Sequence, residues 1–254
     1  MIHVWVFFCL QFGYNYNTMI SDTPSIEPIN TRMFTHIGSP IEMPELKVVT
    51  APSGKRVYHT PEGNIYPSIT TMLGHKEKPW LDDWTKMLGK DKAAKETKRC
   101  VDRGVAIHEM AEKYLSNESN FTKNYDQLHV RGFNQLKFKL NQINNIRLQE
   151  AAIYSDQLKL AGRVDCIGEY DGVLNVIDFK TSNNNKSEQM IEHYFIQCTA
   201  YAIMWHHMTG EAIDQVTILM SVEKGMVPLV FQDSIDKYVS PLLQRIGQYY
   251  KETA

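Results

Sequence analysis

Alternating apolar and polar positions in the middle of the chain predict a β-meander. Three runs rich in β-branched and aromatic residues cover 149–155, 159–170 and 173–180, and they are separated by Asp156-Gln157 and Asp171-Gly172. Short polar breaks of this kind, and Asp-Gly above all, are typical of hairpin turns. The pattern therefore predicts three antiparallel strands in succession.

Helical periodicity appears on both sides of this meander. Apolar residues, His108 and Glu112 recur at helical spacing and predict a helix from about 100 to 116. The same reasoning predicts further helices over 69–73, from Pro79, over 125–141, 187–207 and 234–251, and hairpins over 47–58 and 216–231. We therefore expect the α/β class, with a mixed central β-sheet flanked by helices.

The first 44 residues show no such pattern and are expected to form a flexible tail. The apolar stretch from Ile2 to Phe12 is shorter than the roughly 18 residues that span a membrane, and no basic residue precedes it. The tail could lie upstream of a truer start at Met19 or Met33. Residues 45–254 are expected to form a single domain.

Composition adds little to this picture, but charge is unevenly placed. The chain has 254 residues and a net charge of −2, so it has no overall attraction for nucleic acid. The window 86–103 holds seven basic and three acidic residues, a net charge of +4. Lys95, Lys98 and Arg99 in this window are candidate phosphate contacts, and the alternative is a solvated helix face.

The four cysteines are far apart and form no CxxC pair. This spacing argues against a zinc ribbon, a redox motif or a dense disulfide framework. A reducing compartment, the cytoplasm, is the expected location.

The two-residue turn at Asp171-Gly172 predicts where acidic residues meet. It pairs Tyr170 with Val173, and counting back places Asp165 opposite Asp178. Opposed carboxylates repel unless a positive charge lies between them, so the pair suits a divalent cation. Lys180 projects to the same face as Asp178 and could hold a water molecule or stabilise developing charge. The alternative is a salt network at the end of a surface hairpin.

Four short motifs occur in order and carry a family resemblance. They are Gly104 to His108, Gly162-Arg-Val-Asp165, Asp178-Phe-Lys180-Thr181 and Gln197 to Tyr201. Together they resemble the RecB-like branch of the PD-(D/E)xK nucleases, which includes phage and mitochondrial exonucleases. The resemblance covers roughly residues 65–209.

The resemblance implies a restriction-endonuclease-like core and a metal-dependent active site. His108, Asp165 and Asp178 would hold the cation together with the backbone carbonyl of Phe179, and Lys180 would position or deprotonate the attacking water. Mg²⁺ or Mn²⁺ suits such ligands.

Other residues have both a functional and a structural interpretation. Glu150 is a further candidate ligand or an exposed strand carboxylate, and Glu112 could orient the imidazole of His108. Gln197 and Tyr201 are candidate DNA contacts, with helix packing as the alternative, and Ser68 is a third candidate. Iron-sulfur relatives carry three cysteines after the core, whereas here none follows Cys198, so no cluster is expected.

The resemblance predicts a metal-dependent DNA exonuclease in phage DNA replication, recombination or repair. Its expected partners are DNA with free ends and, because the chain lacks a nucleotide-binding P-loop, a separate helicase or single-strand annealing protein. We expect no membrane association, and host cytoplasm if the protein is phage-encoded. The alternatives are a structure-specific endonuclease, an RNA-directed nuclease and a non-catalytic module that binds DNA ends.

Overall fold

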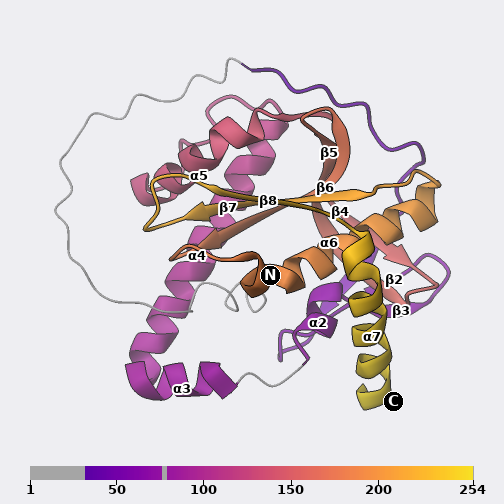
Figure 1. The fold of residues 1–254 in the computed structure, drawn as a ribbon, viewed down its shortest axis with the longest axis horizontal. Helices are drawn as coiled ribbons and strands as arrows, with labels where there is room; N and C mark the ends of the chain where they lie inside the picture. The colour runs from indigo at the N-terminus through magenta and orange to yellow at the C-terminus, as the bar shows by residue number, and fades with distance from the viewer. Residues whose placement is uncertain (1–31, 76–78, 254) are drawn as a thin grey trace.

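A computed structural model describes residues 32–75 and 79–253, with a five-stranded mixed sheet at its centre (Figure 1). The strands lie in chain order as β4 (Ile143–Ser155), β5 (Leu160–Tyr170), β6 (Val173–Ser182), β7 (Gln215–Val222) and β8 (Leu229–Ser234). Neighbours are antiparallel except β6 and β7, which are parallel and joined through a helix. The predicted mixed sheet is confirmed.

The predicted turn sets the register of β5 and β6. Asp171 and Gly172 both have positive φ, 50° and 81°, as a two-residue hairpin turn of type I′ requires. Tyr170 pairs with Val173, and the register continues to Cys166 opposite Ile177. The meander is confirmed, although its first strand starts six residues before the predicted position 149, because a bulge after Asn144 interrupts the alternation.

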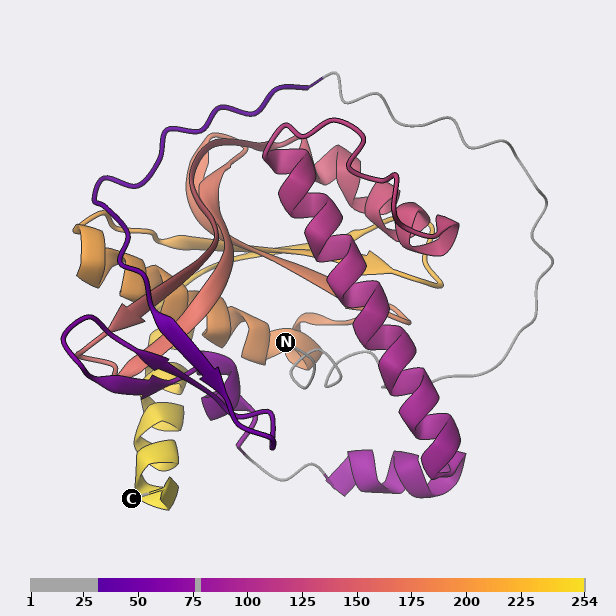
Figure 2. The same ribbon diagram turned by 180° about the vertical axis from the view of Figure 1, so that it is seen from behind.

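Helices cover both faces of the sheet (Figures 1 and 2). One face is covered by α4 (Lys90–Leu115) and α5 (Gln127–Leu140), and the other by α6 (Glu188–Thr209), α7 (Asp236–Thr253) and the short α2 (Ile69–Leu73). The helix α3 (Pro79–Leu88) precedes α4. Successive strand residues enter opposite cores: Ile177 and Phe179 pack under α4 and α5, and Val176 packs under α6.

A small antiparallel sheet lies beside β5. It consists of β1 (Lys47–Thr50), β2 (Arg56–His59) and β3 (Ile65–Pro67). Tyr58 and Tyr66 pack with Ala161 of β5 in a core of their own, and Ser68 forms a bridge to Ala161. This sheet holds α2 against the central sheet.

The packed part of the chain begins before residue 45. Phe34 is 4% exposed and contacts the ring of Tyr114 edge to face, with 5.1 Å between ring centroids. His36 donates a hydrogen bond to the carbonyl of Leu115, and Ile37 donates one to the carbonyl of Ile146 in β4. The expected flexible tail is therefore wrong for residues 34–37. Because these contacts join residues far apart in the sequence, no local periodicity predicts them. Residues 1–31 lie outside the described part of the chain.

Within residues 32–75 and 79–253, no helix is long and apolar enough to cross a membrane.

Candidate active site

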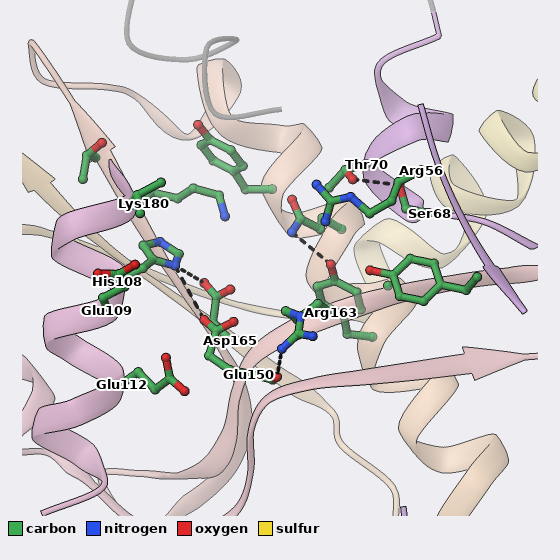
Figure 3. Close-up of a pocket in the computed structure, with 17 residues that line it drawn as sticks. Arg56, Ser68, Thr70, His108, Glu109, Glu112, Glu150, Arg163, Asp165 and Lys180 are labelled. Atoms are coloured by element: carbon green, nitrogen blue, oxygen red, sulfur yellow. Dashed lines mark hydrogen bonds and ion pairs between the residues drawn. The ribbon is translucent and has the colours of Figure 1, made fainter. Parts of the chain in front are cut away.

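A cavity of about 250 Å³ lies where β4, β5 and β6 meet α4, α6 and the small sheet (Figure 3). It is lined by most of the residues that the sequence indicated: His108, Glu112, Glu150, Asp165, Lys180, Gln197, Tyr201 and Ser68. Lys95, Lys98 and Arg99 are not among its lining residues.

Three neighbouring strands each contribute a carboxylate. The pairs Gln149–Cys166 and Ala151–Val164 bracket Glu150, so Glu150 of β4 lies opposite Asp165 of β5. One step beyond the last β5–β6 pair, the register brings Asp165 opposite Asp178 of β6. Glu150 has a φ of 44°, a left-handed conformation that costs a non-glycine residue free energy and is common at functional sites.

The backbone of Phe179 in β6 organises this region. Its N–H donates to the carboxylate of Asp165, 2.8 Å away, and its carbonyl accepts a hydrogen bond from Nε2 of His108. A strand residue directs its N–H and C=O to the same side, and β7 occupies the other side of β6. The β5–β6 ladder therefore ends at this point, because side chains have taken the place of the strand partner.

These contacts leave Nδ1 of His108 facing two carboxylates. It lies 3.6 Å from Asp165 Oδ2 and 3.9 Å from Glu150 Oε1. One donor atom from each of His108, Glu150 and Asp165 lies within 4.8 Å of the others. One imidazole and two carboxylates suit Mg²⁺ or Mn²⁺, so the residues fit a divalent cation.

Asp178 does not belong to this three-residue group. Its carboxylate is buried, contacts the ammonium of Lys180 and accepts a hydrogen bond from the Gln197 amide at 3.3 Å. Lys180 also lies over the ring of Tyr194, with its nitrogen 4.8 Å from the ring centre. Gln197 donates to the hydroxyl of Tyr201 as well, so α6 holds the end of β6 through side chains.

Burial and mutual charge shift the pKa values of these groups. Burial raises the pKa of Asp165 and raises that of Asp178 to about 6, against the lowering effect of Lys180. Burial by itself lowers the pKa of His108 and Lys180, but the nearby carboxylates outweigh it and raise both values. The Lys180 side chain is therefore a cation near neutral pH.

Sequence comparison decides the family. The model of the PD-(D/E)XK nuclease superfamily matches residues 105–240, more than half of the chain. The chain belongs to this superfamily. The expected restriction-endonuclease-like core, a mixed sheet flanked by helices, is confirmed.

Three curated relatives carry the name mitochondrial genome maintenance exonuclease 1. The mouse (Mus musculus) protein is 30% identical over 181 residues, which cover 67% of this chain and 51% of the relative. The human protein is 27% identical over 182 residues, covering 67% and 50%. The Xenopus tropicalis protein is 27% identical over 136 residues, covering 50% and 39%. The chain thus spans about half the length of the mouse and human relatives.

The close approach of α6 to β5 accounts for the glycine in the Gly162-to-Asp165 motif of this PD-(D/E)XK nuclease. A Cβ on Gly162 would lie 2.6 Å from Cε1 of Tyr201 and 3.1 Å from a methyl group of Ile69. The motif glycine and the motif tyrosine are therefore packing partners beside the cavity.

The structure also gives Ser68 a structural role. Its hydroxyl caps α2 by accepting a hydrogen bond from the N–H of Thr71 at 2.9 Å, and the residue is 1% exposed. It borders the cavity, but this bond and two further contacts, to the hydroxyls of Thr70 and Thr71, already engage its oxygen.

The basic window 86–103 is partly neutralised by acidic residues. Lys98 pairs with Asp102, and Arg99 pairs with Glu96 and with Glu223, which follows β7. Arg103 also pairs with Glu223 and is buried. Glu223 is 120 positions from Arg103 in sequence, so a count within the window could not include it.

Several cavity residues lie outside the set that the sequence predicted, and three of them bear on binding. Arg56 of β2, Arg163 of β5 and Tyr194 of α6 all line the cavity. Arg163 stands inside a motif that was read only for its glycine and aspartate. Arg56 lies 109 positions before Asp165, in a different sheet, and no local pattern connects the two.

Proposed function

We propose that this protein is a metal-dependent deoxyribonuclease that hydrolyses DNA from free ends. The observation that carries the proposal is the group of His108, Glu150 and Asp165 beside the ion pair of Asp178 and Lys180. A metal-ligand set beside a buried cation, at the edge of a cavity, is suited to phosphodiester hydrolysis.

Separate residues would bind the metal and act on the attacking water. His108, Glu150 and Asp165 would hold Mg²⁺ or Mn²⁺, with Asp178 as a further oxygen donor. The Phe179 carbonyl, which accepts a hydrogen bond from Nε2 of His108 in this structure, would join them once that bond gives way to the cation. When bound, the cation would activate water and neutralise charge on the phosphate oxygens. Lys180, held as a cation by its carboxylate neighbours, would orient the attacking water or offset the charge that develops on the phosphate.

The exonuclease assignment is supported by the name of the curated relatives. Their name also connects them with genome maintenance, so we propose DNA replication, recombination or repair as the setting. A phage origin and the host cytoplasm rest only on the length and cysteine pattern of the chain. A separate helicase or annealing protein would supply any unwinding.

Three other functions are to be distinguished from this one, and two of them are catalytic. A structure-specific endonuclease or an RNA-directed nuclease would need the same ligand group. A non-catalytic DNA-end-binding module would not need it, and its binding would survive loss of Asp178.

One experiment separates these functions. Purified protein is incubated with end-labelled linear DNA, covalently closed circular DNA and RNA, in single- and double-stranded forms, with Mg²⁺, Mn²⁺ or a chelator. Digestion of linear DNA, with closed circles intact and no cutting in chelator, is expected. Cut circles would favour an endonuclease, and cut RNA would favour the RNA-directed alternative.

Asp165→Asn and Asp214→Asn give a matched pair of variants. Asp165 lies in the ligand group, whereas Asp214 is an exposed carboxylate outside the cavity. Asp214→Asn should cut at the parental rate, and Asp165→Asn should not cut. Equal cutting by both variants would remove the catalytic assignment of this cavity.

A further inference from the structure

The cavity has two electrostatically different sides (Figure 3). Glu109, Glu112, Glu150 and Asp165 lie on the side of α4 and β4, around His108. Arg56, Ser68 and Thr70 lie on the opposite side, and Arg163 lies between the two groups. The acidic side would hold the proposed cation. Neither it nor the Asp178–Lys180 pair gives the two arginines a role.

Arg56 is the more informative of the two. It is half-buried, and its guanidinium makes no ion pair or hydrogen bond with any residue in the described ranges. Its backbone is fixed instead, since its N–H and C=O both bond to the hydroxyl of Thr71. A guanidinium that is partly removed from water and lacks a partner loses hydration without compensation, unless a ligand supplies an anion.

Arg163 is oriented toward the same space. One of its guanidinium nitrogens donates to the backbone carbonyl of Glu150, which fixes the side chain across the cavity. The N–H groups on its other guanidinium nitrogens take no part in that bond. The planar guanidinium of arginine binds a phosphate group well, often through two parallel hydrogen bonds to two of its oxygens.

We propose that Arg56 and Arg163 clamp a phosphate of the bound DNA strand next to the phosphate that is cleaved. This inference rests on the proposed nuclease function, because it places the cleaved bond at the acidic side of the same cavity. The clamp would hold the strand in register and keep a polyanion in a cavity whose opposite side carries four carboxylates. The phosphate could be an internal linkage or a terminal group, since both offer the same oxygens.

Arg56→Gln tests the clamp, with Arg131→Gln as the matched control. Arg131 is exposed on α5, does not line the cavity and makes no ion pair with a described residue. Binding of end-labelled single-stranded DNA is measured in chelator over a range of salt concentrations. The strands carry one neutral methylphosphonate at successive linkages, or a 5′-hydroxyl in place of a 5′-phosphate.

We expect Arg56→Gln to raise Kd by on the order of tenfold and to reduce the salt slope by about 0.7, the value for one single-strand phosphate contact. In the parent protein, removal of the phosphate charge at one position of the strand, either an internal linkage or the 5′ end, should also raise Kd by on the order of tenfold. That position should have no further effect in Arg56→Gln, while Arg131→Gln behaves as the parent.

A parental Kd and salt slope in Arg56→Gln would overturn the clamp, as would a neutral position whose effect persists in that variant. These measurements need no cutting, so they are independent of the nuclease test. A parent that binds DNA through Arg56 but never cuts it would refute the proposed function and leave the clamp intact.

Discussion

At the scale of single residues, the site depends on which backbone groups the strands leave unpaired. Phe179 uses its N–H for Asp165 and its carbonyl for His108, and both bonds are possible only because the β5–β6 ladder stops before it. The imidazole then presents Nδ1 to Asp165 and Glu150. A hydrogen bond to the other ring nitrogen commonly fixes a metal-binding histidine in this way.

The separate roles of the ligands and the lysine lead to the first prediction. Asp165→Asn or Glu150→Gln should weaken Mg²⁺ binding sharply and abolish cutting, because each removes an anionic donor. Lys180→Ala should retain metal binding and slow the cutting step by about a hundredfold or more. His108→Ala should weaken metal binding, with partial rescue by raised Mn²⁺. Calorimetric metal titration beside single-turnover cleavage measures both effects, and parental cutting by all four variants would contradict them.

The contact between Lys180 and the Tyr194 ring gives a second prediction. A desolvated cation–π contact contributes about 2 kcal/mol, so the ring helps to hold the ammonium in place. Tyr194→Leu should lower kcat with little change in KM, and Tyr194→Phe should restore kcat because it keeps the ring. If the phenylalanine variant were as slow as the leucine variant, the hydroxyl rather than the ring would be required.

At the scale of elements, the close approach of Tyr201 to Gly162 helps to set how α6 packs on β5. Gly162 leaves room for Tyr201, and Tyr201 in turn accepts a hydrogen bond from Gln197, which reaches Asp178. The space at Gly162 therefore sets how near the helix lies to the carboxylates.

Gly162→Ala should consequently destabilise the fold, by about 1 to 3 kcal/mol as for other overpacked cores. Gly247→Ala is the control, because Gly247 lies within α7 with no atom near its Cβ direction and the change should stabilise by up to about 1 kcal/mol. Thermal unfolding of both variants measures the difference. Equal melting temperatures would show that Tyr201 moves aside without cost.

The basic segment of α4 gives a further prediction at this scale. If the segment contacts DNA, changing Lys95, Lys98 and Arg99 to glutamate should weaken binding at low salt and reduce the salt slope. Because Arg99 also pairs with Glu223 and Lys98 with Asp102, a variant with only Lys95 changed separates lost DNA contacts from disturbed packing of α4. An unchanged slope in both variants would make the segment a solvated face.

At the scale of the whole molecule, a short N-terminal segment joins elements that are far apart in sequence. Phe34 packs on α4, and residues 35–37 bond to β4 and to the end of α4. The segment thus connects the helix that carries His108 with the strand that carries Glu150.

Two N-terminal truncations should therefore differ in melting temperature. A chain that starts at Met33 keeps Phe34 and should retain its melting temperature and DNA cutting. A chain that starts at Glu45 loses Phe34, and removal of a buried aromatic ring costs about 3 kcal/mol or more. A lowered melting temperature in the first truncation would show that residues before Met33 stabilise the fold.

The sequence alone determined the features that depend on neighbouring residues. The Asp-Gly turn set the register of β5 and β6, and with it the approach of Asp165 to Asp178, because a two-residue turn fixes every pair that follows. The order of the four motifs indicated the family that the comparisons show.

Tertiary structure decided what depends on distant partners. It brought Glu150 and His108 together with Asp165 in one possible ligand group, and it left Asp178 with Lys180 and Gln197. It also brought Arg56 from a separate sheet to the same cavity and paired Arg103 with Glu223. Apart from the Asp178–Lys180 pair, which is local, such contacts follow from how helices and sheets pack. They leave no periodic signal because the partners lie far apart in the sequence.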